Sequence, residues 1–194
     1  MIEIRQIILK RATELFAQFG LKKTSVDQIA ENAGIAKGTI YNYFKSKEEL
    51  FTAIIRSEAE KFVDTITGAL KDCKTSEEKL RTFFLTEFDL LFEYINLFNT
   101  AHKGSHIHEL MTSIGKETDE YYQKMHGIMT SIFEEGIRDG SFKSIDYRTL
   151  ADIVVELFKN MGFPIPFEAL RQERKVIADK INFMIDLLLS GIRK

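Results

Sequence analysis

The residues with the most distinctive chemistry lie close together, between positions 24 and 47. Lys37, Thr39 and Asn42 offer an ammonium group, a methyl group and an amide, which are the groups that read base edges in a DNA major groove. Gly38 stands between them, although glycine inside a helix costs roughly 1 kcal/mol relative to alanine. We interpret Gly38 as a position where the backbone must approach DNA closely.

Three neighbouring residues carry hydrogen-bond donors suited to backbone phosphates. They are Tyr41, Tyr43 and Lys47, and phosphate contacts from such side chains fix a protein's register on the duplex. Each tyrosine also has an alternative interpretation, in which its ring packs half-buried against the first helix, near residues 8–19. For Lys47 the alternative is an ordinary solvated surface.

The spacing around these residues predicts two short helices, over residues 26–33 and 37–44. Ser25 and Gln28 form a capping-box pattern at the start of the first helix. Gly34 can adopt the positive φ that a sharp turn needs. The pattern indicates a helix-turn-helix, whose second helix enters the major groove. A generic helical hairpin is the alternative.

Helical periodicity extends along nearly the whole chain and predicts an all-α fold. Only 11 Gly and 2 Pro occur among 194 residues, too few for the many turns of an all-β fold. The pattern predicts nine helices, near residues 8–19, 26–33, 37–44, 46–66, 75–98, 107–114, 117–138, 146–162 and 168–191. We expect a DNA-binding domain over residues 1–47 and a helical body over residues 48–194.

The overall charge hides a difference between the two parts of the chain. The formal net charge is −2, which alone argues against a basic nucleic-acid binder. Residues 1–50, however, hold 8 Lys or Arg and 6 Asp or Glu, whereas residues 51–194 carry a net negative charge. We therefore expect modest nonspecific DNA affinity. One cysteine, no secretory signal pattern and no long apolar run predict a cytoplasmic protein without a membrane span.

The sequence offers little support for catalysis or for a metal site. It shows no nucleophile–base pair and no glycine-rich phosphate loop, so we expect neither enzyme activity nor a cofactor. His102, His106 and His108 lie within seven residues, but no cysteine or acidic cluster completes a ligand set. We interpret this segment as a polar loop between helices and expect no metal.

Four segments together resemble the N-terminal domain of the tetracycline-repressor (TetR) family: FAQFG (16–20), TSVDQIA (24–30), AGIAKGTIY (33–41) and YFKSKEEL (43–50). The resemblance implies an all-helical homodimer that represses transcription and releases its operator when it binds a small molecule. It also implies that Thr24 and Ser25 face the DNA backbone. The chain departs from the family pattern at Ala36, where a capping serine is common, and at Tyr43, where histidine is common.

The body carries the residues expected to line an effector pocket. Apolar side chains would surround the central helix and favour a hydrophobic or aromatic effector: Phe62, Phe84, Phe88, Leu91, Phe92, Met111, Tyr122, Met125, Met129, Phe133 and Phe158. The alternative is that most of them are plain core. Glu87 and Asp89 interrupt this apolar stretch, and either one needs a partner if it points inward.

The last two helices are expected to form the dimer interface, because the final helix is apolar on two faces and one chain covers only one of them. The interface prediction comprises Leu150, Val154, Leu157, Ile181, Met184, Ile185 and Leu188, with Phe183 and Leu187 on the second face. A two-fold dimer suits a palindromic operator. The alternatives are a constitutive structural or cell-division DNA-binding factor without an inducer, and an activator.

Overall fold

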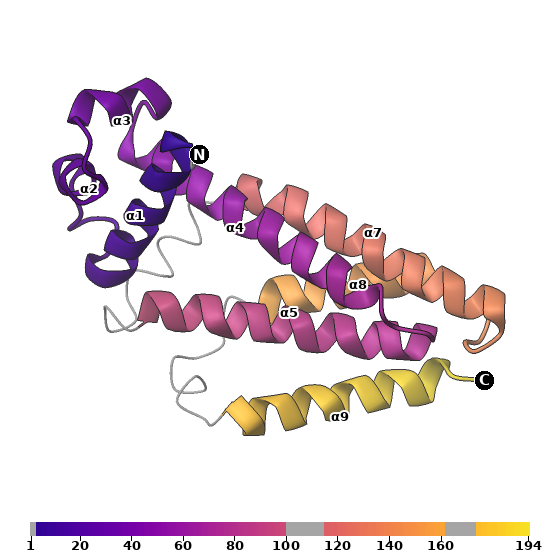
Figure 1. Ribbon diagram of the computed structural model, residues 1–194. Coiled ribbons are helices and arrows are strands. Elements are labelled where there is room, and N and C mark those ends of the chain that lie inside the picture. The colour runs from indigo at the N-terminus through magenta and orange to yellow at the C-terminus, as the bar shows by residue number, and fades with distance from the viewer. Residues whose placement is uncertain (1–2, 100–114, 162–173) are drawn as a thin grey trace. The chain divides into compact units, whose positions relative to one another are not determined.

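The computed structural model describes residues 3–99, 115–161 and 174–194, and every regular element among them is an α-helix (Figure 1). The helices are α1 (Ile4–Phe19), α2 (Val26–Ala33), α3 (Lys37–Tyr43), α4 (Lys47–Leu70), α5 (Ser76–Asn99), α7 (Gly115–Asp139), α8 (Tyr147–Met161) and α9 (Arg174–Ile192). The all-α prediction is confirmed. The helix predicted over residues 107–114 lies outside the described residues.

The chain forms two compact units. One contains residues 1–59 and 93–118, and the other contains residues 60–92 and 119–194, so α4 and α5 each contribute to both. No described helix is long and apolar enough to cross a membrane.

The first unit has a core built by the apolar stripes of α1, α2, α3 and the start of α4. Ile8, Ala12 and Phe16 recur on one face of α1, as a buried helix face requires. The rings of Phe16 and Phe51 meet edge to face, with their centroids 5.8 Å apart. Ile40 of α3 is 1% exposed against this core, which fixes the outer face of α3 toward solvent.

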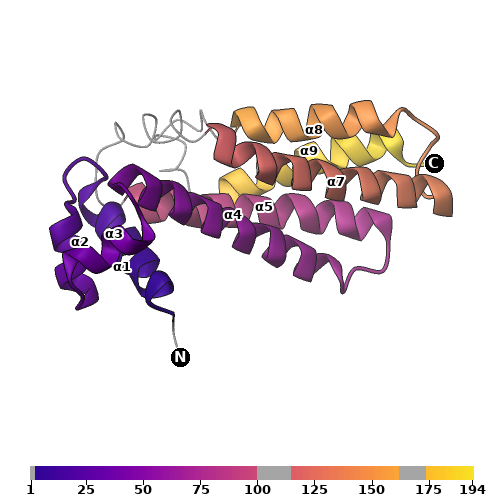
Figure 2. The same cartoon turned by 90° about the horizontal axis from the view of Figure 1, so that it is seen from above.

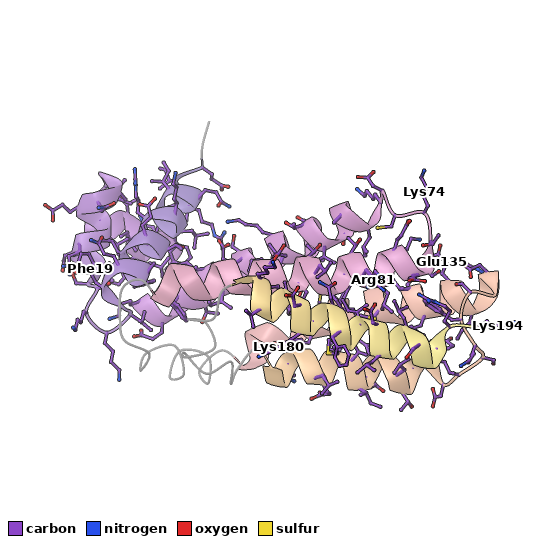
Figure 3. The ribbon with its side chains drawn as sticks, turned by 90° about the horizontal axis from the view of Figure 1, so that it is seen from below. Phe19, Lys74, Arg81, Glu135, Lys180 and Lys194 are labelled. Atoms are coloured by element: carbon purple, nitrogen blue, oxygen red, sulfur yellow. The ribbon has the colours of Figure 1, made fainter. Side chains whose placement is uncertain are left out.

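The second unit is a bundle in which α5, α7, α8 and α9 run along one another with the latter part of α4 (Figure 2). Its core is dominated by aromatic, methionine and branched side chains: Leu80, Phe83, Phe84, Phe88, Met125, Met129, Ile132, Phe133, Val154, Ile185 and Leu189. Ion pairs join neighbouring helices at its surface. Lys79 Nζ lies 2.6 Å from Glu135 of α7, and Arg81 pairs with Asp186 of α9. Glu135 and Arg81 are labelled in Figure 3.

The turn after α7 closes the bundle through a close aromatic contact. The Phe142 ring is 2% exposed and lies directly over Gly136. A Cβ at position 136 would lie 2.2 Å from Phe142 Cδ2, so only glycine fits there. The Lys143 amide donates to the Ile192 carbonyl at 2.7 Å, which attaches this turn to the end of α9.

Candidate nucleic-acid interface

The turn between α2 and α3 has the geometry that the sequence predicts. The Gln28 amide donates to Ser25 Oγ at 3.2 Å, and the Ser25 amide donates to Gln28 Oε1 at 2.8 Å, which completes the capping box. Gly34 has a φ of +66°, a conformation that favours glycine. The Ile35 amide donates to the Ala30 carbonyl at 3.0 Å, so α2 ends sharply and α3 starts in a new direction.

Helix α3 begins without a side-chain cap. Ala36 occupies the N-cap position in extended conformation, and no side chain there accepts a helix amide. The helix is 7 residues long and ends at Tyr43. Because a missing cap costs about 1 kcal/mol, α3 depends on the buried Ile40 and Phe44 side chains for its stability.

The outer face of α3 presents most of the predicted contact residues. Lys37, Gly38 and Asn42 are exposed and Thr39 is half-buried. Tyr41 is 46% exposed and Tyr43 is 40% exposed. A Cβ at Gly38 would meet nothing within 4 Å, so packing inside the protein does not explain the glycine.

The family resemblance implies that Thr24 faces the DNA backbone, but its side chain is buried in this structure. Its side chain is 2% exposed. Its hydroxyl donates to the Leu15 carbonyl at 3.2 Å and is 2.9 Å from the Gly20 carbonyl. In this structure the Thr24 side chain therefore braces the turn before α2 and is not on the surface, whereas Ser25 is exposed.

Both lysines predicted to contact DNA form hydrogen bonds with other groups of the chain. Lys47 Nζ donates to the carbonyls of Leu21 at 2.8 Å and Thr24 at 3.1 Å, so it ties the start of α4 to the turn before α2. Lys37 Nζ lies 2.8 Å from Asp27 Oδ2. The hydrogen bond from Lys37 to the Asp27 carboxylate raises the pKa of Lys37 above its ordinary value.

Basic residues beside the motif are further candidates that the sequence reasoning left out. Lys23 and Lys45 are exposed at the two ends of the helix-turn-helix. Arg5 stacks over the Phe44 ring, with its guanidinium carbon 5.6 Å from the ring centroid. The basic type of Lys23 and Lys45 and their positions flanking the motif were visible in the sequence, but their exposure was not.

Most of the predicted pocket residues whose side chains are described lie in the core of the second unit. Phe84, Phe88, Met125, Met129 and Phe133 are buried, whereas Phe62 and Tyr122 are half-buried. The side chains of Leu91, Phe92, Met111 and Phe158 lie outside the described part of the chain. Burial of this kind agrees both with a plain core and with a pocket wall.

Glu87 points inward from the middle of this apolar set. It is 7% exposed, and the Tyr121 hydroxyl donates to its Oε2 at 2.5 Å. Burial raises the pKa of Glu87 to about 7, although the hydrogen bond from Tyr121 acts in the opposite direction. Burial and the nearby Glu87 charge also raise the pKa of Tyr121. Asp89, the other acidic residue singled out, is half-buried.

A separate groove of about 530 Å³ lies on the second unit and is lined by residues of α4, α5 and α7, with Lys71 just after α4. Its lining mixes aliphatic side chains with lysines: Val63, Thr67, Leu70, Lys71, Lys79, Lys124, Gly127, Ile128, Ser131, Ile132 and Glu135. None of the predicted pocket residues is among them. Lys79 and Glu135 neutralise each other within it.

Helices α8 and α9 carry an unusual number of exposed apolar side chains. They are Ile153 at 52%, Leu157 at 48%, Val176 at 41%, Phe183 at 65% and Leu187 at 57% exposed. Of the predicted interface residues, Val154, Ile181 and Ile185 are instead buried in their own chain, and Leu150, Met184 and Leu188 are half-buried. The free face of α9 is therefore the Phe183–Leu187 side, because the other stripe fills the chain's own core.

Comparison with known proteins supports the helix-turn-helix assignment. The model of the bacterial regulatory proteins of the tetR family matches residues 8–54. The transcriptional repressor KstR2 of Mycolicibacterium smegmatis is 30% identical over 182 residues, which cover 87% of this chain and 85% of the relative. The chain belongs to the tetR family.

Further relatives of this tetR-family chain match over nearly its full length. The fatty acid metabolism regulator protein of Bacillus subtilis is 28% identical over 189 residues, covering 95% of this chain and 93% of the relative. The structure of the regulator FadR from Bacillus subtilis in complex with stearoyl-CoA aligns with a TM-score of 0.70 and 26% identity, covering 97% and 99% of the two chains. This tetR-family protein is therefore a DNA-binding transcriptional regulator and not an enzyme.

Proposed function

We propose that the chain represses transcription by binding an inverted-repeat operator as a homodimer, with α3 of each protomer in a major groove. The observation that carries this proposal is the exposed outer face of α3, held by the Gly34 turn and the buried Ile40. In this proposal residues 1–47 form the DNA-binding domain. Because operator DNA lies in the bacterial cytoplasm, we place the protein there.

The contacts divide into base contacts and phosphate contacts. Lys37, Thr39 and Asn42 face base edges, with Gly38 admitting the DNA close to the backbone. Ser25, Tyr41 and Tyr43 bind phosphates. Thr24 and Lys47 act instead by holding the turn that places Ser25, as their internal hydrogen bonds indicate.

The remaining chain, residues 48–194, binds the effector and forms the dimer. We assign the dimer interface to the exposed apolar face of α8 and α9, centred on Phe183 and Leu187. A ninth helix over residues 107–114 completes this domain in our proposal. Apolar faces of this kind are buried against a partner in stable oligomers.

We propose a hydrophobic effector that enters among the aromatic and methionine side chains of the second unit. Fatty acyl-CoA thioesters are the first class to test, since one relative regulates fatty acid metabolism and another was solved with stearoyl-CoA. The effector shifts the protein between two states only by its differential affinity for them. We propose that it tilts α4, which begins directly after the helix-turn-helix, and so changes the spacing of the two α3 helices.

The base and phosphate assignments are tested by fluorescence anisotropy on a duplex selected from random DNA and on a scrambled duplex. Asn42→Ala removes a base contact, so it should weaken the selected duplex by about 1–3 kcal/mol and leave the scrambled one unchanged. Tyr41→Phe removes a phosphate contact, so it should weaken both duplexes alike. Equal loss on both duplexes for Asn42→Ala contradicts its base-reading role.

The effector class is tested by adding stearoyl-CoA to the protein–DNA complex. Coenzyme A and free stearate, each alone, are the matched controls. Release of DNA by the thioester at concentrations where neither control acts supports an acyl-CoA effector. If stearoyl-CoA and a series of shorter acyl-CoA thioesters all leave the complex intact, this effector class is wrong. Increased transcription from the bound promoter would favour an activator.

A further inference from the structure

An exposed ion pair joins the two helices of the helix-turn-helix. Lys37 is the first residue of α3 and Asp27 lies in the first turn of α2. Their charged atoms are 2.8 Å apart, and the two side chains remain 48% and 66% exposed. The pair is therefore open to solvent and to any ligand that reaches the start of α3.

This pairing has a cost for DNA binding, because the carboxylate and DNA compete for the same ammonium group. Lys37 donates one of its three ammonium N–H groups to Asp27, so a phosphate or guanine edge must either share the ammonium with this carboxylate or displace it. The Asp27 charge also repels the phosphates that approach it. Residues 1–50 have a net charge of only +2, and Lys47 already donates to backbone carbonyls. The availability of Lys37 should therefore have a measurable effect on DNA affinity.

We propose that Asp27 sets the affinity of the DNA-binding surface: it holds Lys37 in the free protein and is displaced by a DNA acceptor on binding. This inference rests on the proposed position of α3 against DNA. Asp27 thereby lowers the affinity of the protein for DNA of every sequence. A duplex binds tightly only when its other contacts offset the loss of the Asp27–Lys37 ion pair. If Asp27 instead served only to orient Lys37 for reading a base, its removal would weaken binding.

The chain offers a matched control for the charge change. Glu31 lies one turn further along α2 and is exposed, so Glu31→Gln removes the same charge from the same helix. The set consists of Asp27→Asn, Lys37→Gln, the double variant of both, and Glu31→Gln. Affinities are measured by fluorescence anisotropy on a selected duplex and on a scrambled duplex at one fixed salt concentration, because salt alone changes DNA affinity strongly.

Asp27→Asn should bind both duplexes more tightly than the unaltered protein. Breaking an exposed ion pair of this kind changes an equilibrium constant by about 1.4- to 5-fold in each protomer. The DNA affinity of the dimeric Asp27→Asn protein should therefore rise by roughly 2- to 25-fold. Glu31→Gln should raise the DNA affinity by a smaller factor. When Lys37 is already Gln, Asp27→Asn should give no more than the gain of Glu31→Gln, because the ammonium that Asp27 would release is gone.

Three outcomes overturn the inference. They are weaker binding by Asp27→Asn, a gain equal to that of Glu31→Gln, and an undiminished gain when Lys37 is Gln. The proposed function has a separate check, since it requires the unaltered protein to prefer the selected duplex over the scrambled one. Absence of that preference would overturn the proposed function and this inference with it.

Discussion

The buried carboxyl of Glu87 makes the stability of the protein depend on pH in a way that a single substitution should remove. Glu87→Gln keeps the shape of the side chain and a hydrogen-bonding oxygen for Tyr121, but it cannot ionise. Burial raises the pKa of Glu87 from its ordinary 4.5 to about 7 in the folded chain. The folded protein therefore holds the proton more tightly than the unfolded chain does.

The sign and the size of the effect follow from this difference. Because the pKa of Glu87 is higher in the folded chain, proton binding by Glu87 favours the folded state. This contribution to the free energy of unfolding is fully present below pH 4.5 and is lost as the pH rises through about 7. Each pH unit between the two values corresponds to about 1.4 kcal/mol, so the loss amounts to about 3 kcal/mol. Above about pH 8 the loss is complete and constant.

Urea unfolding at pH 4.5, 5.5, 6.5, 7.5 and 8.5, at one fixed protein concentration, measures this effect. The free energy of unfolding of Glu87→Gln minus that of the unaltered protein should rise by about 3 kcal/mol across this range. Glu134, which is exposed on α7, gives the matched control Glu134→Gln, whose difference should stay flat. Parallel pH profiles for Glu87→Gln and the unaltered protein would show that the pKa of Glu87 is not raised in the folded chain.

Two further predictions address packing and assembly. Gly136→Ala forces a methyl group into the Phe142 ring and should lower the free energy of unfolding by about 1–3 kcal/mol, as urea unfolding measures; unchanged stability would contradict the contact. Phe183→Asp places a charge at the centre of the exposed α9 face and should yield monomers in sedimentation equilibrium. Thr65→Asp, which adds the same charge to an exposed position of α4, should stay dimeric. A dimeric Phe183→Asp protein would place the interface elsewhere.

Local signals in the sequence were sufficient to predict the helix-turn-helix. The capping box of Ser25 and Gln28 and the left-handed Gly34 are confirmed because each depends on neighbours within four residues. The roles of Thr24 and Lys47 depend on carbonyls up to 26 residues away. Residue type shows that a side chain has donors, but not which acceptor the fold brings near.

The body of the protein shows a second limit of prediction from sequence. Helix α9 has two apolar stripes, and periodicity alone does not decide which one faces the chain's own core. The structure buries Ile181 and Ile185 and leaves Phe183 and Leu187 exposed. The inward direction of Glu87 was likewise undecided until its contact with Tyr121 was known.

In the proposed function, the two α3 helices of a dimer read an inverted repeat. Selection of duplexes from a random DNA pool by the full chain, followed by sequencing, tests it most directly. We predict an enriched palindrome whose half-site centres lie about 34–36 Å apart or a multiple of one helical turn, and Gly38→Ala should reduce the enrichment. Enrichment of a single asymmetric site, or of no sequence at all, would contradict the claim.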